Sequence, residues 1–250
     1  MDIFKDNLAL MILIVGCASL FVIMIRILWL DGKNVKQQQD FLQRIRNRIL
    51  EDTTYRIDGS VCSIADFQKV DPFFQPEMVS CLLFDRLQSV QAAWSQQCYD
   101  QLRTLVGEKL YRMSEKRLHS LEKIGQKNLI TDIEFLGSKI LGATYDSETG
   151  KEEIEIDFDI SCYDYLVSSH SSRIISGSND QRLRIGYYLV FGRNQKVDQK
   201  ASWPEHCTNC EHELSSNNTL LCPYCNAMIY PLHYDFRLLE KRVIEEEQLH

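Results

Sequence analysis

Four cysteines near the C-terminal end of the chain form two pairs with the same internal spacing. Cys207-Thr208-Asn209-Cys210 is followed, after 11 residues, by Cys222-Pro223-Tyr224-Cys225. Two residues between cysteines let one tight turn aim both sulfurs inward, so two such turns supply four thiolates. Zinc accepts four soft ligands in a tetrahedron without geometric strain or redox chemistry. The spacing therefore predicts one structural zinc ion per chain, bound by Cys207, Cys210, Cys222 and Cys225.

Other chemistries are compatible with paired cysteines. A redox dithiol needs only one Cys-x-x-Cys pair beside a helix start. An iron–thiolate electron carrier would need a partner electron site, and the sequence displays none. His206 and His212 flank the first pair and are alternative ligands. Four cysteines leave no open coordination position, which favours a structural site over a catalytic one.

The residue after the second cysteine of each pair is expected to adopt a positive φ, for which glycine is the usual residue. Glu211 and Asn226 occupy these two positions. Asparagine tolerates the left-handed conformation, whereas a glutamate bears a cost of about 1–2 kcal/mol.

A run of carboxylates offers a second candidate chemistry. Glu153, Glu155, Asp157 and Asp159 alternate with Ile154, Ile156, Phe158 and Ile160, which predicts a strand with one charged face. Asp157 or Asp159 would be candidates for acid–base catalysis if the charged face turned inward. Burying four carboxylates together is costly, so we expect this face to meet water or a basic partner. The sequence contains no nucleophile elbow, phosphate-binding glycine loop or His/carboxylate helix motif, and we predict no enzyme activity.

The apolar periodicity indicates which elements carry these residues. Helical spacing predicts a helix over Pro76–Trp94 and a second from Leu102 to Ile124, which Gly125 ends. Further along, the period becomes alternating. Strands are expected at Leu129–Tyr145 with a bulge at Gly137, at Glu153–Ile160 and at Leu183–Phe191, with a turn at Asp146–Gly150 and a polar loop around Ser168–Asp180. Helices followed by an antiparallel meander predict an α+β domain.

Leu8–Leu30 is the most apolar segment of the chain, with Arg26 as its single charge. Its 23 residues would form a helix of about 35 Å, enough to cross about 30 Å of hydrocarbon. A cleaved signal peptide would have a shorter apolar run and a more basic start. A lipoprotein signal is the remaining alternative, because Ile14-Val15-Gly16-Cys17 places small residues before a cysteine. A single transmembrane helix is the favoured interpretation.

Flanking charge orients this helix. Asp2, Lys5 and Asp6 precede it, and five basic residues follow it: Lys33, Lys36, Arg44, Arg46 and Arg48. The basic excess places the C-terminal part in the cytoplasm. Apolar residues at helical spacing between 31 and 54 predict an amphipathic helix or a solvated spacer helix, with Arg44, Arg46 and Arg48 as candidate contacts for lipid phosphates. The basic stretch from Arg103 to Lys127 is a further candidate, although a solvated face with Glu–Arg pairs such as Glu108–Arg112 is the favoured explanation.

Composition agrees with a folded cytoplasmic domain. The 250 residues carry a net charge of −7 and 10% aromatic residues, which excludes disorder and argues against a dedicated nucleic-acid binder. The remaining soluble-domain cysteines are scattered singly, as expected for free thiols: Cys62, Cys81, Cys98 and Cys162. We therefore expect no nucleic-acid partner and no disulfide framework.

Several of these residues resemble a known family. The segment from Phe67 to Phe74 (FQKVDPFF), the Ala93-Trp94 pair and Asp100, together with the helix–helix–meander order, are similar to the C-terminal domain of the 44-kilodalton subunit of the mitochondrial inner-membrane import translocase and its bacterial relatives. The resemblance covers roughly Ile64–Phe236. It implies a cone of helices on a curved antiparallel sheet, similar to nuclear transport factor 2, and a membrane-tethered adaptor with a groove for lipid or peptide. Some bacterial relatives similarly combine a membrane segment, this domain and a zinc ribbon.

The expected organisation follows: residues 1–7 a short extracytoplasmic tail, 8–30 the transmembrane helix, 31–63 a basic juxtamembrane helix and linker, 64–200 the α+β cone domain, 201–230 the zinc ribbon, and 231–250 a last strand or helix with an acidic tail. The expected function is a non-enzymatic scaffold in the cell membrane, anchored through residues 8–30, that binds an unidentified protein partner or lipid and acts in protein transport or membrane-complex assembly. The alternatives are a ligand-binding or acid–base enzyme of the cone fold, and a thiol redox sensor.

Overall fold

The computed structural model describes residues 53–214 and 220–249. The expected transmembrane helix at 8–30, Cys17, and the arginines at 44, 46 and 48 lie outside these residues. Within the described part of the chain, no helix combines the length and the apolar character that a bilayer crossing requires.

Four helices precede most of the sheet: α2 (Ile64–Val70), α3 (Pro76–Gln96), α4 (Tyr99–Leu105) and α5 (Glu108–Lys123). Ser63 caps α2, because its hydroxyl oxygen accepts a hydrogen bond from the backbone N–H of Asp66 at 3.1 Å. Pro76 begins α3, where its missing N–H would have no partner within the helix. The expected helix over Pro76–Trp94 is confirmed and extends two residues further.

The helix expected from Leu102 to Ile124 is instead two helices, α4 and α5. Val106 between them is extended, with φ −123° and ψ 159°, and bridges to Leu238 on the last strand. The backbone N–H of Gly107 donates to the carbonyl oxygen of Leu238 at 2.8 Å. A tertiary contact therefore causes the break between the two helices. The spacing of apolar residues within a helix gives no information about such a contact. The left-handed turn at Gly125 is confirmed, with φ +63°.

Seven strands form one sheet: β1 (Thr54–Ile57), β2 (Ser60–Cys62), β3 (Gln126–Asp146), β4 (Lys151–Ser168), β5 (Ile174–Gly177), β6 (Leu183–Asn194) and β7 (Arg237–Gln248). Their order is β2-β1-β3-β4-β6-β7, with β5 added to β4. Pairing is antiparallel except between β1 and β3. Residues 54–62, expected in the juxtamembrane segment, thus form β1 and β2. Likewise the expected polar loop at Ser168–Asp180 contains β5.

The alternation along β4 is confirmed. Ile154, Ile156, Phe158 and Ile160 are at most 1% exposed and face the helices. The Phe84 ring on α3 lies 5.1 Å from the Phe135 ring and 5.8 Å from the Phe158 ring, so α3 covers the inner face of β3 and β4. The register shift between Phe135 and Gly137 confirms the expected bulge.

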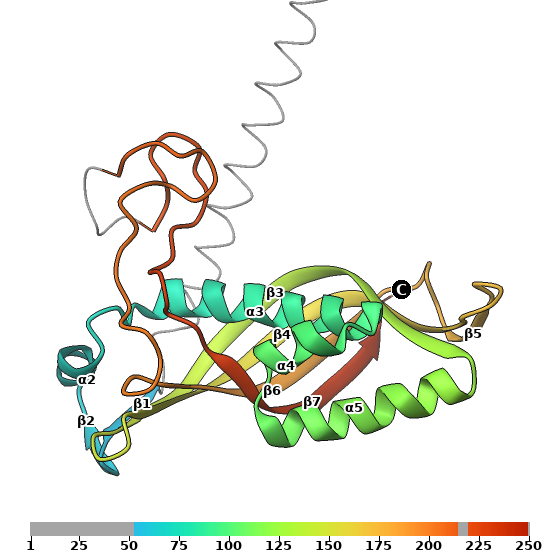
Figure 1. The fold of residues 1–250 in the computed structure, drawn as a ribbon, viewed down its shortest axis with the longest axis horizontal. Helices are drawn as coiled ribbons and strands as arrows, with labels where there is room; N and C mark the ends of the chain where they lie inside the picture. The colour runs from blue at the N-terminus through green and yellow to red at the C-terminus, as the bar shows by residue number, and fades with distance from the viewer. Residues whose placement is uncertain (1–52, 215–219, 250) are drawn as a thin grey trace, which may run out of the picture. The chain divides into compact units, whose positions relative to one another are not determined.

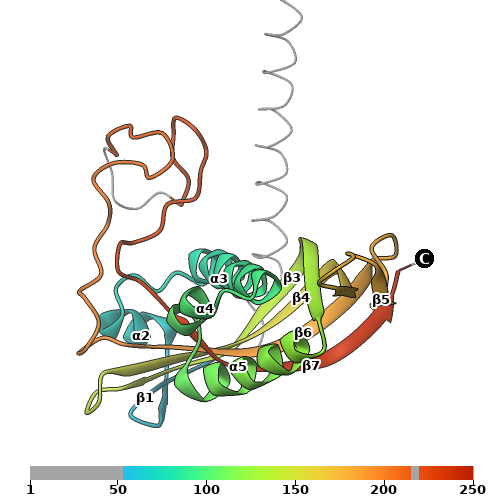
Figure 2. The same cartoon turned by 45° about the vertical axis from the view of Figure 1, so that its right-hand side comes forward.

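The sheet curls around the helices (Figure 1 and Figure 2). Helix α5 contacts both β3 and β7, although β4 and β6 separate these two strands in the sheet. A single helix can reach both only if the sheet bends strongly, as bulged antiparallel sheets do. The α+β class and the curved sheet are therefore confirmed. The two cysteine pairs lie in the connection between β6 and β7.

Candidate metal centre

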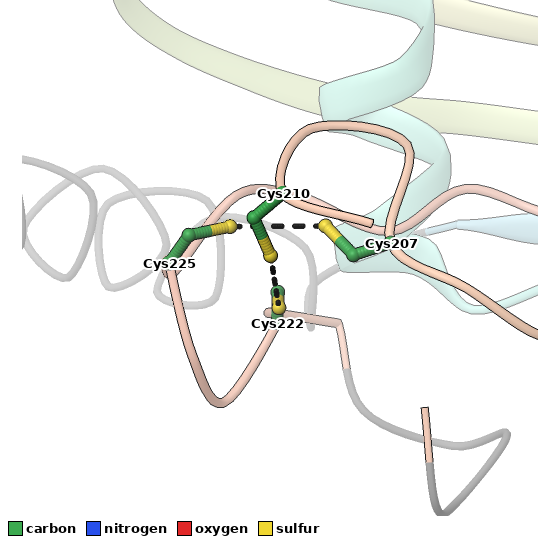
Figure 3. A group of neighbouring side chains, drawn as sticks. All are labelled: Cys207, Cys210, Cys222 and Cys225. Carbon is green, nitrogen blue, oxygen red and sulfur yellow. Dashed lines mark hydrogen bonds between the residues drawn. The ribbon is translucent and has the colours of Figure 1, made fainter. Parts of the chain in front are cut away.

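The four paired cysteines converge in the structure. Their Sγ atoms all lie within 4.8 Å of one another. The four side chains point toward a common centre from two separate loops (Figure 3). Cys207 and Cys222 are buried, at 2% and 0% exposure, whereas Cys210 and Cys225 are half-buried. The centre is thus shielded on one side and reachable on the other.

The sulfur spacing fits a metal better than a disulfide. The Sγ atoms of Cys207 and Cys225 are 3.7 Å apart, as are those of Cys210 and Cys222. Bonded sulfurs would be about 2.05 Å apart. A tetrahedron with Zn–S bonds of about 2.3 Å has edges of about 3.8 Å. The four free thiols therefore lie close enough together to hold a tetrahedral metal ion.

Both cysteine pairs use the same turn. In the first pair, the N–H of Glu211 donates to the carbonyl of Cys207 at 2.9 Å, and in the second the N–H of Asn226 donates to that of Cys222 at 2.8 Å. Glu211 has φ +62° and Asn226 has φ +56°. The expected left-handed residue after each pair is confirmed.

Backbone pairing joins the two sides of each cysteine turn at its base. An antiparallel bridge joins His206 to Glu213 around the first pair, and another joins Leu221 to Met228 around the second. Beneath the sulfurs lies a small cluster of buried side chains: Cys207, Leu214, Cys222 and Ile229, with Trp203 packed against them. A cluster of this size supplies little hydrophobic stabilisation by itself, so the unit depends on its cysteines.

Two of the four thiols have pKa values that are shifted in opposite directions. The Asn209 side chain and the backbone of Ala227 donate toward Cys225 and lower the pKa of its thiol to about 6. At Cys210, the His212 backbone lowers the pKa, but burial and the three neighbouring thiols outweigh it and raise the pKa to about 12. The thiolate of Cys225 therefore forms readily, whereas Cys210 would lose its proton only beside a cation.

The two flanking histidines are not part of the cluster. The His212 ring stacks on Tyr224 with centroids 4.4 Å apart, and its Nδ1 atom lies 3.4 Å from the carbonyl oxygen of Cys210. His206 is exposed and takes part in the bridge to Glu213. The donor set within metal-binding distance is the four cysteines, as the spacing predicts.

The segment leaving the ribbon is fastened to the helices. The Tyr230 hydroxyl donates to Asp85 on α3 at 2.6 Å, and Asp235 pairs with Arg86 one residue further along the helix. The Tyr234 hydroxyl donates to Asp71 in the loop between α2 and α3. These contacts fix the start of β7 against α3 and the loop before it.

Asp71 belongs to a buried polar cluster that sequence reasoning missed. Arg193 at the end of β6 places Nη2 3.1 Å from Asp71 and Nε 2.8 Å from Glu152, and its guanidinium lies 4.2 Å from the Tyr234 ring centre. Asp71 is 1% and Glu152 0% exposed. Burial, then the charge of Asp71, raise the pKa of Glu152 to about 8 against the effect of Arg193. The Arg193 guanidinium thus contacts two carboxyl groups, and that of Glu152 holds a proton at neutral pH.

A signal for Glu152 was present in the sequence. The alternation that places Ile154, Ile156 and Phe158 inward also places Glu152 inward when it is extended back by one step. Asp71 lies in the FQKVDPFF motif, but nothing in the motif indicates its partner. Arg193 lies 122 positions later in the chain.

Asp157 and Asp159 lie on the outer face of the sheet, away from the helices. Arg184 on β6 binds Asp159, with Nη2 at 2.6 Å from one oxygen. Asp157 lines an open groove with Lys139, Arg184 and Ile244, and burial raises the pKa of its carboxyl group. The charged face of β4 is therefore turned outward, as expected. These carboxylates do not meet the cysteine cluster.

Residues 61–204 match the model of one protein family, Tim44, described as the Tim44-like domain. The match covers more than half of the chain and includes α2 to α5 and β3 to β6. It stops just before Cys207, so the metal centre lies outside it. No curated protein matches the chain.

Proposed function

Because the chain belongs to the family with a Tim44-like domain, we propose that it is a membrane-associated, non-enzymatic scaffold for protein transport or membrane-complex assembly. The family match over residues 61–204 is the observation that carries this proposal. In its fuller form, residues 8–30 anchor the chain in the cell membrane, Arg44, Arg46 and Arg48 contact lipid phosphates, and the domain faces the cytoplasm.

The proposed scaffold would bind a metal ion through its four paired cysteines. Cys207, Cys210, Cys222 and Cys225 would hold one zinc ion, whose chemistry here is to cross-link the two turns. Protein sulfur would take all four coordination positions, which would leave none for a substrate. The ion would stabilise a unit whose own apolar cluster is small.

The described carboxylates support a structural rather than a catalytic domain. A catalytic acid of this kind of fold is an isolated carboxyl group in a pocket. Glu152 and Asp71 are buried, but both contact Arg193 and neither is isolated. Asp159 is neutralised by Arg184 on the outer face.

The membrane part of the proposal is tested by fractionation. The full chain is produced in bacterial cells, and the membranes are washed with alkaline carbonate. We expect the chain to stay in the pellet, and a variant with Val15→Lys and Ile23→Lys to move to the wash because two charges would enter the hydrocarbon. A matched control, Val61→Lys, changes a side chain that is 71% exposed and should stay in the pellet. Recovery of the unaltered chain in the wash would refute the anchor.

A further inference from the structure

Helix α5 presents one continuous stripe of exposed side chains. Positions 109, 112, 113, 116, 120 and 123 fall on one face of the helix, and Ile124 follows its last residue as the C-cap. All seven are exposed: Lys109, Arg112, Met113, Lys116, Ser120, Lys123 and Ile124. The stripe contains four cations and no carboxylate. The glutamates of α5 lie on another face, at 108, 115 and 122.

Most of this positive charge is unpaired. Arg112 contacts Glu108 at 2.7 Å, with both side chains more than half exposed. Lys109, Lys116 and Lys123 form no ion pair with any residue that the structure describes. The surplus is local, because the whole chain carries a net charge of −7. Solubility alone does not explain why positive charge is concentrated on one helix face of an acidic protein.

Two large apolar side chains lie within the cationic stripe. Met113 is 61% and Ile124 is 63% exposed. Met113 lies in the second turn of α5, and Ile124 comes directly after the last residue of the helix. A helix that combines lysines with exposed apolar side chains on one face is typical of peripheral contact with a membrane. Solvation by water would account for the exposed lysines, but not for the two exposed apolar side chains among them.

We infer that this stripe of α5 lies on an anionic lipid surface. The lysine ammonium groups meet phosphate headgroups while Met113 and Ile124 enter the interface. A helix face that carries both unpaired lysines and exposed apolar side chains suits the interface of an anionic bilayer, which offers phosphates to the first and hydrocarbon to the second. The inference rests on the proposed membrane tether, which keeps α5 within reach of the bilayer, and it adds a second contact that fixes the orientation of the domain.

Amine acylation tests the inference on the full chain. The protein is reconstituted into vesicles of phosphatidylcholine, either alone or mixed with phosphatidylglycerol at about 30 mol%, on the order of the anionic content of cell membranes. The rate at which each lysine is labelled is then measured by mass spectrometry. We expect the rates at Lys109, Lys116 and Lys123 to fall about threefold or more in the anionic vesicles. Lys200, which is exposed, should label at the same rate in both.

A pair of variants tests whether the stripe itself, rather than another surface of the domain, makes the lipid contact. Met113→Asp with Ile124→Asp should return the three lysines to the rates found in neutral vesicles. The matched control is Val197→Asp, which changes an 80% exposed side chain elsewhere and should keep the protection. Equal labelling of the three lysines in both vesicle types would overturn the inference.

The outcomes distinguish this inference from the anchor. Failure to recover the chain with neutral vesicles contradicts the anchor alone, whereas recovery in both vesicle types without lysine protection contradicts only the α5 contact. Protection that occurs in native membranes but not in pure lipid vesicles would also overturn the inference, in favour of an acidic protein partner.

Discussion

The phenolic hydroxyl of Tyr234 donates a hydrogen bond to Asp71, which lies 163 positions earlier in the chain. Tyr234 belongs to the segment that leaves the ribbon, and Asp71 to the loop between α2 and α3. Asp71 also contacts Arg193 at 3.1 Å, so the pair connects three segments that are distant in sequence. The beginning of β7 is thereby fixed before it joins the sheet.

Removal of the Tyr234 hydroxyl should destabilise the domain. Tyr234→Phe keeps the buried ring but takes a hydrogen-bond donor from a carboxylate, which costs about 2 kcal/mol. Urea unfolding should show this loss as a lower midpoint with an unchanged slope. Tyr224→Phe, in a side chain that is 58% exposed, is the matched control and should leave the midpoint unaltered. Equal midpoints for both variants would show that the contact contributes nothing.

The protonated carboxyl group of Glu152 should make stability depend on pH. Its pKa is raised from 4.5 to about 8 on folding, so the folded chain holds a proton that the unfolded chain releases between these values. This contribution to stability is complete below pH 4.5 and is lost as the pH rises toward 8. Glu152→Gln should flatten that decline, because the amide does not ionise. The free energy of unfolding, measured from pH 5 to 8.5, checks this.

The control for the pH experiment is Glu148→Gln, at an exposed position in the turn before β4. It should follow the pH profile of the unaltered chain. If the profile of Glu152→Gln runs parallel to that of the unaltered chain, the carboxyl group of Glu152 is ionised throughout and the protonated state assigned to it is wrong.

Gly107 should not tolerate a side chain. A Cβ atom there would lie 2.8 Å from the Leu239 side chain, and a Cβ at Gly192 would lie 2.6 Å from the same side chain. Leu239 is therefore confined between two glycines and cannot easily move aside. Gly107→Ala should cost about 1–3 kcal/mol by overpacking, measured as a lower thermal midpoint.

Gly186→Ala is the contrasting substitution, because its nearest neighbour would be at an ordinary 3.4 Å. It should change the free energy of unfolding by about 0.5 kcal/mol or less. Similar losses at both glycines would mean that Leu239 does not set the break between α4 and α5.

Glycine at position 211 should strengthen the metal site. Glu211 has φ +62° and bears the strain of a left-handed conformation, about 1 kcal/mol, which glycine relieves. Glu211→Gly should therefore slow the transfer of zinc to a chelator. Asn226→Gly should change the rate less, because asparagine adopts this conformation at lower cost. A faster release from Glu211→Gly would contradict the strain argument.

Periodicity predicted the elements that are stabilised by their own patterns. α3, β4 and β6 carry a repeating apolar face, and the spacing of Cys207, Cys210, Cys222 and Cys225 alone identified the cluster. The break at Val106–Gly107 depends on Leu238 and Leu239, more than 130 positions later. Contacts of that range leave no local pattern in the sequence.

The buried polar cluster shows the same limit. Glu152 could be assigned to the inner face from the alternation of β4, but its partners could not, because Asp71 and Arg193 come from a loop and another strand. β1 and β2 were also missed. They contain only 4 and 3 residues, too few for an alternation to stand out, and they are set by pairing with β3 and with each other.

Metal content measures the central claim most directly. The full chain is purified with zinc present, and the metal is counted per chain by elemental analysis beside native mass spectrometry. We predict one zinc per chain, its loss in Cys222→Ser, and its retention in Cys62→Ser, a half-buried thiol outside the cluster. Unchanged zinc in Cys222→Ser, or a chain that holds no metal and forms disulfides between the two pairs reversibly, would contradict a zinc-braced scaffold.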